Sequence, residues 1–359
     1  MMDLAWGEDF TALADVSKSV FARYSPLEER TNSVPFGEQI AQFAELGWLQ
    51  LSDPVAADAD SPSLGTIAAV FVEMGRALAD TPLLDLTIAR DMALLIGTER
   101  STEVAERIGS GGAVVIPVFP STDWGSAVSY SNGSLNGVAL AIGHADHADS
   151  FLVHTAGDNG VVALVDSSSS IGIETMPNMG GHSMFAVTFD NVPVAEADVL
   201  AGGDDAHRAA LLAGQRGAVL RAAQVYGAGM RLLDMTVSYA QQRRQFGGPI
   251  GRFQAVQYLC TDIAIAAHLT SAHVRSVVAA IESGDDPQPH LGLMCKQAAK
   301  TALQMVHCAH EVHAGIGYMV ESNVHLFTDA AKRWQYDFGN AAENNASIAS
   351  AITRIYEGA

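Results

Sequence analysis

The sequence predicts an α+β protein with a helical N-terminal domain (residues 1–111), a middle β-barrel or sandwich domain (112–202) and a C-terminal antiparallel four-helix bundle (203–359). Apolar residues recur at three- and four-residue steps before residue 110 and again after residue 206, which is typical of helices. Between residues 113 and 200 the chain is rich in β-branched residues, Gly, Ser and Asn, which is typical of strands and turns. With 48% hydrophobic residues, the 359-residue chain can bury a large core.

Composition excludes several classes of function. The formal net charge of -20 argues against binding to nucleic acid or to an anionic membrane surface. No apolar run reaches the ~18 residues that a membrane span needs. The first residues are acidic and lack the basic stretch of a signal peptide. Three cysteines without CxxC spacing, Cys260, Cys295 and Cys308, indicate reduced packing residues in a cytoplasmic protein.

The elements follow from these patterns in order. Helices are expected where apolar residues keep helical spacing, at 10–21, 40–46, 67–78, from Pro82, and at 101–109. Strands are expected at 114–119, 150–154, 161–165 and 183–189. Turns are expected at Asn132-Gly133, Asn136-Gly137 and Asn159-Gly160, because Asn-Gly pairs favour tight turns. Long helices are expected at 209–242, 253–281, 293–312, 324–334 and 341–356, and their short connections indicate an antiparallel bundle.

A tight turn joins the first two of these long helices. Gly247 and Gly248 can take positive φ, and Pro249 cannot continue a helix. Arg243 and Arg244 precede the turn, so two cations lie at a helix C-terminus. They match the helix dipole, and their forked donors also suit a diphosphate. From this stretch alone, both interpretations stay open.

Two other motifs indicate packing. Gly227-x-Gly229 lies inside an Ala-rich helix and follows no strand, so it indicates close helix packing and not a dinucleotide-binding turn. His307, His310 and His313 share one helical face, but no carboxylate cluster accompanies them and the HExxH spacing is missing. We therefore expect no metal site.

Three stretches resemble the acyl-CoA dehydrogenase family. Phe189-Asp-Asn-Val-Pro-Val194 resembles the motif that ends the family's β domain, and Arg243-x-x-Phe246-Gly247 followed by Phe253-Gln254 resembles its arginine–phenylalanine–glutamine signature. His313-Ala-Gly-Ile-Gly-Tyr318, continuing to Arg333, resembles its His-Gly-Gly-x-Gly-Tyr segment and the helix after it. The order and spacing of these stretches agree over most of the chain, and the family has the same helical, β, helical layout.

The resemblance implies a cofactor, FAD, that two subunits share. In the family, the β domain of one subunit holds the isoalloxazine ring, and the C-terminal bundle of its neighbour holds the ADP half. By resemblance, Arg243, Phe246 and Gln254 make these ADP-side contacts here. The glycines Gly315 and Gly317 would let the backbone approach the same diphosphate.

The family's catalytic base has no equivalent in this sequence. Dehydrogenation needs a carboxylate that removes the α-proton of the acyl-CoA. The family places this glutamate at one of two positions, which correspond here to Gly217 and Phe338. Neither is a carboxylate. Asp337 is adjacent to the second position, but it is offset by one residue and shorter than Glu, so it is only a weak candidate.

The β domain also departs from the family pattern. The segment that touches flavin and substrate corresponds to residues 117–124, which do not match it. Gly143-His-Ala-Asp-His147 replaces the Lys-x-Trp run that packs on the flavin, and Asn340-Ala-Ala342 replaces Thr-x-Gln. Glu311 stands where the family often has Gln, which is unfavourable beside a diphosphate. The missing residues serve the subunit's own flavin ring and acyl-CoA, whereas the retained ones serve a neighbour's flavin.

We therefore hypothesise that the chain is the non-catalytic subunit of a heteromeric FAD-dependent acyl-CoA dehydrogenase. Resemblance to actinobacterial steroid side-chain dehydrogenases implies an α2β2 assembly with a catalytic acyl-CoA dehydrogenase subunit. It also implies a steroid-CoA or a similarly bulky acyl-CoA as the substrate, and an electron-transfer flavoprotein or similar acceptor. One alternative is a self-sufficient homotetrameric enzyme with an unusual base, for which Asp337 is the candidate. The other is a non-enzymatic scaffold, which would have no need of Arg243, Phe246 and Gln254.

Overall fold

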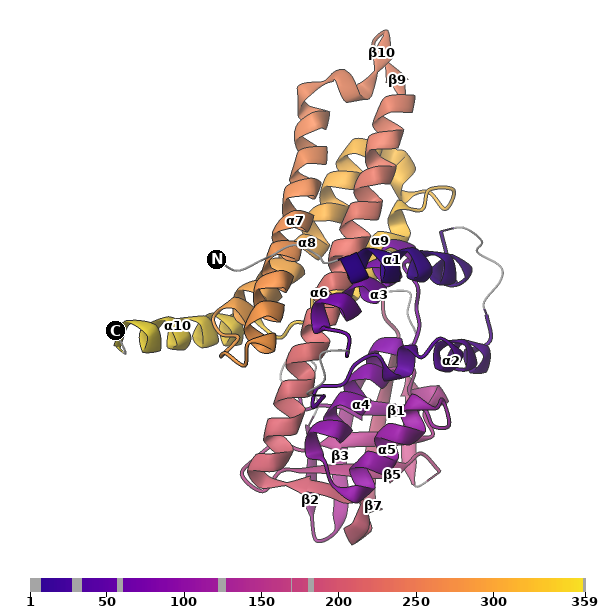
Figure 1. Cartoon of the computed structure of the whole chain (residues 1–359). Coiled ribbons are helices and arrows are strands. Elements are labelled where there is room, and N and C mark those ends of the chain that lie inside the picture. The colour runs from indigo at the N-terminus through magenta and orange to yellow at the C-terminus, as the bar shows by residue number, and fades with distance from the viewer. Residues whose placement is uncertain are drawn as a thin grey trace.

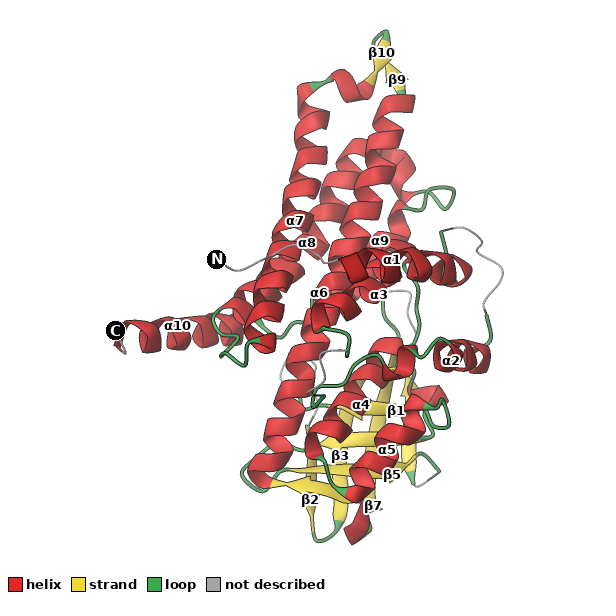
Figure 2. Cartoon of the chain, viewed as in Figure 1, coloured by secondary structure: helices red, strands yellow, loops and turns green. Residues whose placement is uncertain are grey.

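A computed structural model describes residues 8–27, 34–56, 61–121, 127–168, 170–179 and 184–357. Helices come first along the chain, strands second and helices last, as the sequence predicts (Figures 1 and 2). Helix α5 ends at Gly109 and β1 begins at Val115, while β8 ends at Gly202 and α6 begins at Gly203. The element types therefore change close to residues 111 and 202, and the division into three domains at these positions stays a prediction.

The N-terminal helices have identifiable start and stop residues. Ser63 and Thr98 cap α3 and α5 by accepting hydrogen bonds from the backbone N–H groups of Thr66 and Ser101. Gly97 ends α4 with a φ of 70°, the left-handed conformation that favours glycine. The elements are α1 Glu8–Phe21, η1 Ala22–Tyr24, α2 Phe36–Glu45, η2 Trp48–Gln50, α3 Leu64–Ala77, α4 Leu83–Ile96 and α5 Glu99–Gly109.

Two four-stranded sheets with orders β1-β4-β5-β8 and β2-β3-β7-β6 form the described part of the middle region. Side chains from both sheets share one apolar core, in which Phe151 meets Phe189 edge-on with ring centroids 6.3 Å apart. The elements are β1 Val115–Val118, β2 Ala127–Ser131, β3 Ser134–Gly143, η3 Ala145–His147, β4 Ser150–His154, β5 Val161–Asp166, β6 Ile171–Thr175, β7 Met184–Pro193, η4 Glu196–Asp198 and β8 Val199–Gly202.

The predicted turns have different outcomes. Asn132 and Gly133 both take positive φ, 51° and 77°, and connect β2 to β3 as a two-residue hairpin turn. Asn136-Gly137 was wrongly predicted as a turn, because it lies inside β3 where the pairing with β7 shifts register. A Cβ at Gly137 would lie 2.0 Å from the Ala127 carbonyl oxygen, so this glycine serves close strand approach and not a chain reversal.

Helix α6 is the axis of the C-terminal half. Its first turns lie beside the sheets, and its second half joins α7, α8 and α9 in a bundle (Figure 1). Gly227 and Gly75 permit its close contact with α3, since a Cβ on either would lie 1.9 Å from a backbone oxygen of the other helix. This confirms the packing interpretation of Gly227. The elements are α6 Gly203–Gln242, β9 Arg244–Gln245, β10 Gly248–Pro249, η5 Ile250–Arg252, α7 Gln254–Glu282, α8 His290–His313, η6 Ala314–Tyr318, α9 Val324–Trp334 and α10 Ala341–Glu357.

Helix α7 is long and apolar enough to cross a membrane by length and composition alone, and it is the single such helix in the described ranges. Half of its most apolar stretch is packed inside the protein. Its inward face packs against α6 and α8, so the bundle accounts for much of this hydrophobicity.

A buried ion pair fastens α6 to the N-terminal helices. Asp91 of α4 is 1% exposed, and its Oδ2 lies 2.7 Å from Nε of Arg216 on α6. Ser52 Oγ donates to the same carboxylate oxygen at 2.9 Å and accepts from Nη2 of Arg216 at 2.8 Å. Three separate segments therefore meet at one carboxylate.

Asp91→Asn should lower the free energy of unfolding by about 3–5 kcal/mol, because it leaves the Arg216 guanidinium buried without a counter-charge. Urea titration followed by circular dichroism measures this loss. The matched control is Asp286→Asn, which removes the partner of Arg354 from an ion pair whose side chains are 63% and 59% exposed. The control should change stability by less than about 1 kcal/mol, and an equally small effect of Asp91→Asn would contradict the role of this pair.

Candidate functional site

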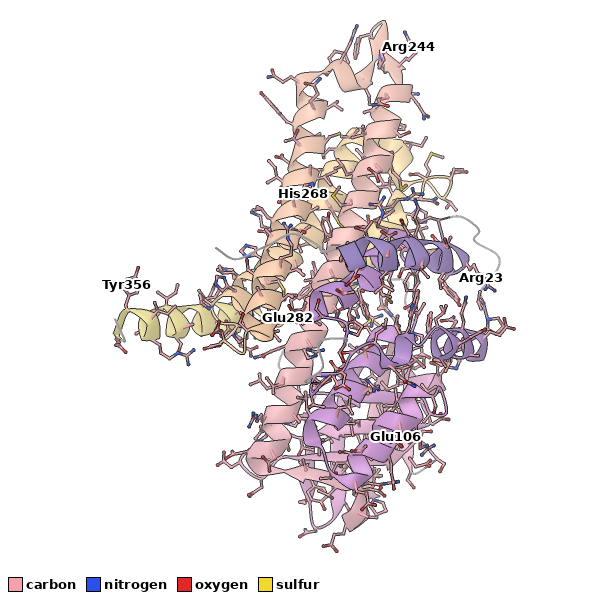
Figure 3. All side chains as sticks on the ribbon, viewed as in Figure 1. Arg23, Glu106, Arg244, His268, Glu282 and Tyr356 are labelled. Atoms are coloured by element: carbon pink, nitrogen blue, oxygen red, sulfur yellow. The ribbon has the colours of Figure 1, made fainter. Side chains whose placement is uncertain are left out.

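A short hairpin projects from the end of the C-terminal bundle, far from the β sheets (Figure 1). Helix α6 ends at Gln242, and Arg243 leaves the helix with an extended backbone. Strand β9 then pairs antiparallel with β10, and the Ile250 N–H donates to the Arg243 carbonyl at 2.9 Å, which closes the loop. Arg244 lies at the outer end of this hairpin (Figure 3). Residues 243–254 are hereafter called the tip.

The tip brings Arg243, Phe246 and Gln254 to the same end of the bundle, and all three are exposed. Phe246 is 85% exposed although its side chain is entirely apolar. Gln254 begins α7, and its Nε2 donates to the Tyr258 hydroxyl at 2.5 Å. Through these three residues the tip presents a guanidinium, an aromatic ring and an amide to the outside, beside the further exposed arginines Arg244 and Arg252. Such groups suit a nucleotide with its phosphates.

The glycine segment lies close to the tip. Tyr239, in the last turn of α6, stacks on His313, the last residue of α8, with centroids 4.3 Å apart. Gly315 follows in η6 and has no neighbouring atom within 4 Å of where its Cβ would be, so its backbone is open to approach. Gly317 differs, because its Cβ would lie 2.9 Å from His310 Nδ1. Of the two glycines, Gly315 offers free backbone, and Gly317 permits packing against His310.

Two histidines near the end of α8, His310 and His313, stack on tyrosines. The His310 ring stacks on Tyr318 at 4.2 Å, and its Nε2 hydrogen bonds to the Thr328 hydroxyl at 2.7 Å. Burial, together with the nearby His310, lowers the pKa of His313 to about 4, so its ring is neutral at pH 7. In the described part of the chain, no three His, Cys, Asp or Glu side chains gather as a metal site would require.

A separate cleft of about 290 Å³ lies between the sheets and α6. Side chains from α4, β1, the end of β3 and α6 line it, together with Arg333 of α9 and Asp337. Gly217, one of the two positions where the resemblance would place the catalytic base, lies in its wall, as do Pro117 and Phe119 from the stretch that corresponds to the flavin- and substrate-contacting segment. Residues 117–124 are the stretch predicted to correspond to the segment that contacts flavin and substrate. The last three of them, 122–124, lie outside the described residues.

Neither position expected for a catalytic carboxylate could carry one without rearrangement. Gly217 lines the cleft, and a Cβ there would lie 2.6 Å from Cδ1 of Ile88 on α4. Phe338 is 4% exposed and belongs to the main apolar core. Arg216, beside Gly217, is paired with Asp91 instead of facing the cleft.

Asp337, the weak candidate base, is held by arginines. Its Oδ2 lies 2.9 Å from Nε of Arg221 and 4.0 Å from Nε of Arg333. Burial lowers the pKa of Arg221. Burial acts the same way on Arg333, but the carboxylates of Asp337, Asp80 and Asp85 together raise its pKa. Because arginine is effectively always protonated in proteins, Asp337 is the counter-ion of two largely buried cations and not a free base.

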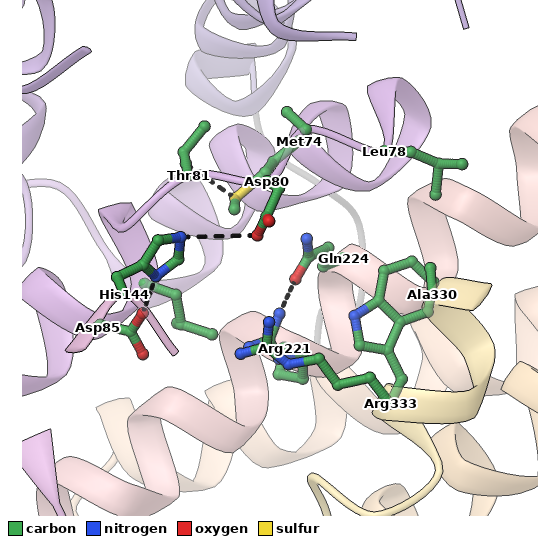
Figure 4. A pocket seen from close by; sticks show the side chains of 13 residues that line it. Met74, Leu78, Asp80, Thr81, Asp85, His144, Arg221, Gln224, Ala330 and Arg333 are labelled. Carbon is green, nitrogen blue, oxygen red and sulfur yellow. Dashed lines mark hydrogen bonds and ion pairs between the residues drawn. The ribbon is translucent and has the colours of Figure 1, made fainter. Parts of the chain in front are cut away.

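His144 extends this charge network to the N-terminal helices, around a small inner cavity of about 20 Å³ (Figure 4). His144 follows β3 in a left-handed conformation, with Nδ1 2.9 Å from Oδ2 of Asp85 and Nε2 3.6 Å from Oδ1 of Asp80. Burial acts to lower its pKa, but the two aspartates raise it to about 9. The imidazole is therefore a cation at pH 7.

The end of β3 lines the cleft, but side chains of other elements pack closely against it and against the residues that follow. A Cβ at Gly143 would lie 3.0 Å from Nη2 of Arg333, and His147 stacks on Phe36 of α2 at 4.1 Å. Sequence reasoning predicted that this segment lacks the family's flavin contacts, which stays a prediction, and it did not predict the charge network around the segment. Its charges come from Asp80, Asp85, His144, Arg221, Arg333 and Asp337, and no local pattern links them.

The two regions fit FAD differently. Among the described residues that line the cleft, both carboxylates are ion-paired, Asp85 with His144 and Asp337 with Arg221, so these residues do not supply the free base that the reactive half of a flavin–substrate pair needs. The tip fits the ADP half, because it offers exposed donors beside open backbone at Gly315.

Comparison with known proteins gives concordant matches. A family profile described as acyl-CoA dehydrogenase, C-terminal domain, matches residues 208–352. The acyl-CoA dehydrogenase IpdE2 of Mycolicibacterium smegmatis is 30% identical over 266 residues, covering 74% of this chain and 71% of that protein.

Two solved structures share the fold. The ChsE4-ChsE5 complex from Mycobacterium tuberculosis matches with a TM-score of 0.86 at 24% identity, covering 98% of this chain and 99% of that one. A protein described as the Tcur3481-Tcur3483 steroid ACAD G363A variant matches with a TM-score of 0.84 at 22% identity, covering 98% and 100%. Both confirm the fold class predicted from the sequence.

The stability of the protein should fall as pH rises from about 7 to 9.5, because His144 loses its proton. A group whose folded-state pKa is raised above its ordinary value of 6.5 contributes stability that is full below 6.5 and is lost as pH rises through about 9. Melting temperature measured across this range should fall in the wild type and fall less in His144→Gln. His147→Gln, at a histidine whose side chain is 47% exposed, is the control and should follow the wild type. Parallel curves for His144→Gln and wild type would contradict this account.

Proposed function

Because the chain belongs to the acyl-CoA dehydrogenase family, we propose that it is the non-catalytic subunit of a heteromeric, FAD-dependent acyl-CoA dehydrogenase. In this assembly its tip contacts the ADP half of a flavin whose ring is held by a catalytic partner subunit. The observation that carries the proposal is the contrast between the two regions. The ADP-side residues Arg243, Phe246 and Gln254 are present and exposed, while an ion-pair network lines the subunit's own cleft.

The residues of the tip have distinct roles in this proposal. The Arg243 guanidinium would donate to the diphosphate, Gln254 would donate through its amide, and Phe246 would pack against the nucleotide or the partner's wall around it. The open backbone at Gly315 would approach the same phosphates. The bound FAD supplies a two-electron acceptor for α,β-dehydrogenation of an acyl-CoA, and an electron-transfer flavoprotein or similar protein would receive the electrons.

Exposed apolar surface supports association with another subunit. On the outer face of α7, Tyr258, Ile265 and Leu269 are 59%, 52% and 46% exposed and recur at helical spacing from the tip inward. Exposed apolar side chains along one helix face, here with the polar Thr261 and Asp262 between the first two, support a protein–protein interface. The acidic chain, with its formal net charge of -20, would also meet less repulsion from a less acidic partner than from its own copies.

Similarity also supports the substrate class. One solved neighbour is described as a steroid ACAD and another as the ChsE4-ChsE5 complex. We propose a steroid-CoA or a similarly bulky acyl-CoA as the substrate of the assembly, and an α2β2 composition. In this arrangement the partner provides the carboxylate base, since neither Gly217 nor Phe338 can.

The chain expressed alone should bind little FAD and should show no acyl-CoA-dependent dye reduction. The complex purified from the native host, through an affinity tag on this chain, should be yellow and active. Arg243→Ala should raise the dissociation constant for FAD of the deflavinated complex by about 10–100-fold, the effect of losing a charge-assisted contact to phosphate. Fluorescence titration with FAD measures it.

Arg208→Ala is the matched control, because Arg208 is an exposed arginine near the start of α6, about 50 Å along the helix from the tip at 1.5 Å per residue. It should leave FAD affinity unchanged. A lone chain that is already yellow and active would overturn the proposal in favour of a homomeric enzyme. Unchanged FAD affinity in Arg243→Ala would favour a scaffold.

A further inference from the structure

The tip contains an unusual backbone conformation at Phe246. Its φ is 51°, in the left-handed region that a bulky side chain rarely adopts. Most of its side chain is in solvent, so burial of the ring within this chain does not offset the unfavourable conformation. A residue keeps such a conformation when contacts from its neighbours stabilise it. The contacts within the tip show which neighbour stabilises Phe246.

Arg252 contacts Phe246 from the opposite side of the hairpin. Its Nη2 donates a hydrogen bond to the Phe246 carbonyl oxygen. Its guanidinium carbon lies 5.0 Å from the centroid of the Phe253 ring, in a cation–π contact. Phe253 in turn meets the Phe246 ring edge-on, with centroids 6.0 Å apart at 87°. Arg252 therefore holds the backbone of Phe246 directly and its ring through Phe253.

The hairpin also leaves room for the Arg252 side chain. A Cβ at Gly248 would lie 2.8 Å from Nη1 of Arg252, so any other residue there would have to displace the guanidinium. The adjacent Gly247 takes a φ of 83°, which lets the chain reverse directly after Phe246. The two glycines, the positive φ of Phe246 and the position of the Arg252 side chain thus all agree with the same conformation of the hairpin.

We infer that Arg252 is a positioning residue that fixes Phe246 in the orientation in which it meets the partner-held flavin. The inference rests on the proposed function, because it assumes that Phe246 contributes to FAD binding. Arg252 has the right chemistry for this role, since a planar guanidinium can stack on Phe253 and donate to a carbonyl at the same time. A lysine could donate to the carbonyl but offers no plane for stacking.

The bracing itself is tested on the full chain alone. Trypsin cleaves after Arg243 and Arg244, and the rate of cleavage reports how often the tip opens. Arg252→Ala should raise this rate about tenfold, the effect of losing a stacked, charge-assisted contact. Arg208→Ala should leave it unchanged. An unchanged rate in Arg252→Ala would overturn the inference whatever happens to the flavin.

The functional consequence is tested on the complex purified through the tagged chain. Arg252→Ala should raise the dissociation constant for FAD about tenfold, and Arg252→Lys should recover only part of the affinity. Because Arg252 acts through Phe246, the double variant Arg252→Ala/Phe246→Ala should bind FAD no more weakly than Phe246→Ala alone. Additive losses in the double variant, or full recovery by lysine, would contradict the positioning role.

The two proposals fail separately. If Arg243→Ala weakens FAD binding and Arg252→Ala does not, only the role of Arg252 is wrong. If neither variant weakens FAD binding, the proposed function fails and the role of Arg252 at the flavin fails with it.

Discussion

The ion pair between Arg221 and Asp337, with Arg333 beside it, determines the character of the cleft. The two arginines approach from α6 and α9, and the network around them reaches His144 at the end of β3 and Asp80 and Asp85 near the start of α4. Charges this buried are stable only when paired. The network thus joins helices from both ends of the chain to the sheets through the protein's own side chains. Four of these side chains, Asp85, Arg221, Arg333 and Asp337, line the cleft between the sheets and α6.

At the opposite end of the bundle, the polar and aromatic groups of the tip are exposed to solvent. There the chain exposes Arg243, the Phe246 ring and the Gln254 amide. Phe246 has an unfavourable positive φ, and burial of its ring within this chain does not offset the cost. Preorganised, exposed groups are typical of a surface that meets a ligand or partner, because ordering them beforehand reduces the entropy lost on binding. The two regions together are consistent with a division of labour between subunits. One subunit would contribute binding groups, and the other would contribute the chemistry.

The sequence predicted the order of the elements and the location of the tip because both depend on local signals. The strand at 150–154 has the bounds of β4, and the Asn132-Gly133 turn is present because a two-residue hairpin turn is determined by its own residues. Strands β2 and β3 were not predicted, since Ser, Asn and Gly weaken the strand pattern. The prediction of a turn at Asn136-Gly137 was wrong, because the glycine is required by the close approach of the Ala127 backbone and not by local turn geometry.

The candidate site also has features that the local sequence predicts and features that only the tertiary fold produces. The exposure of Arg243, Phe246 and Gln254 follows from their place at a helix–turn–helix junction, which the sequence marks with Gly247, Gly248 and Pro249. The absence of a carboxylate at positions 217 and 338 is also evident from the residue types. The replacing network was not predictable, because its charges are distant in sequence and only the tertiary fold brings them together. The bracing by Arg252 likewise depends on a positive φ that the sequence does not reveal.

Photolabelling would test the shared flavin site most directly. The deflavinated complex would be reconstituted with FAD that carries an azide on its adenine ring, irradiated, and digested for mass spectrometry. The account predicts that the adenine labels this chain at the tip, within residues 243–254. Labelling of the partner alone, or of this chain's own β region, would contradict the claim that this subunit holds the ADP half of its neighbour's flavin.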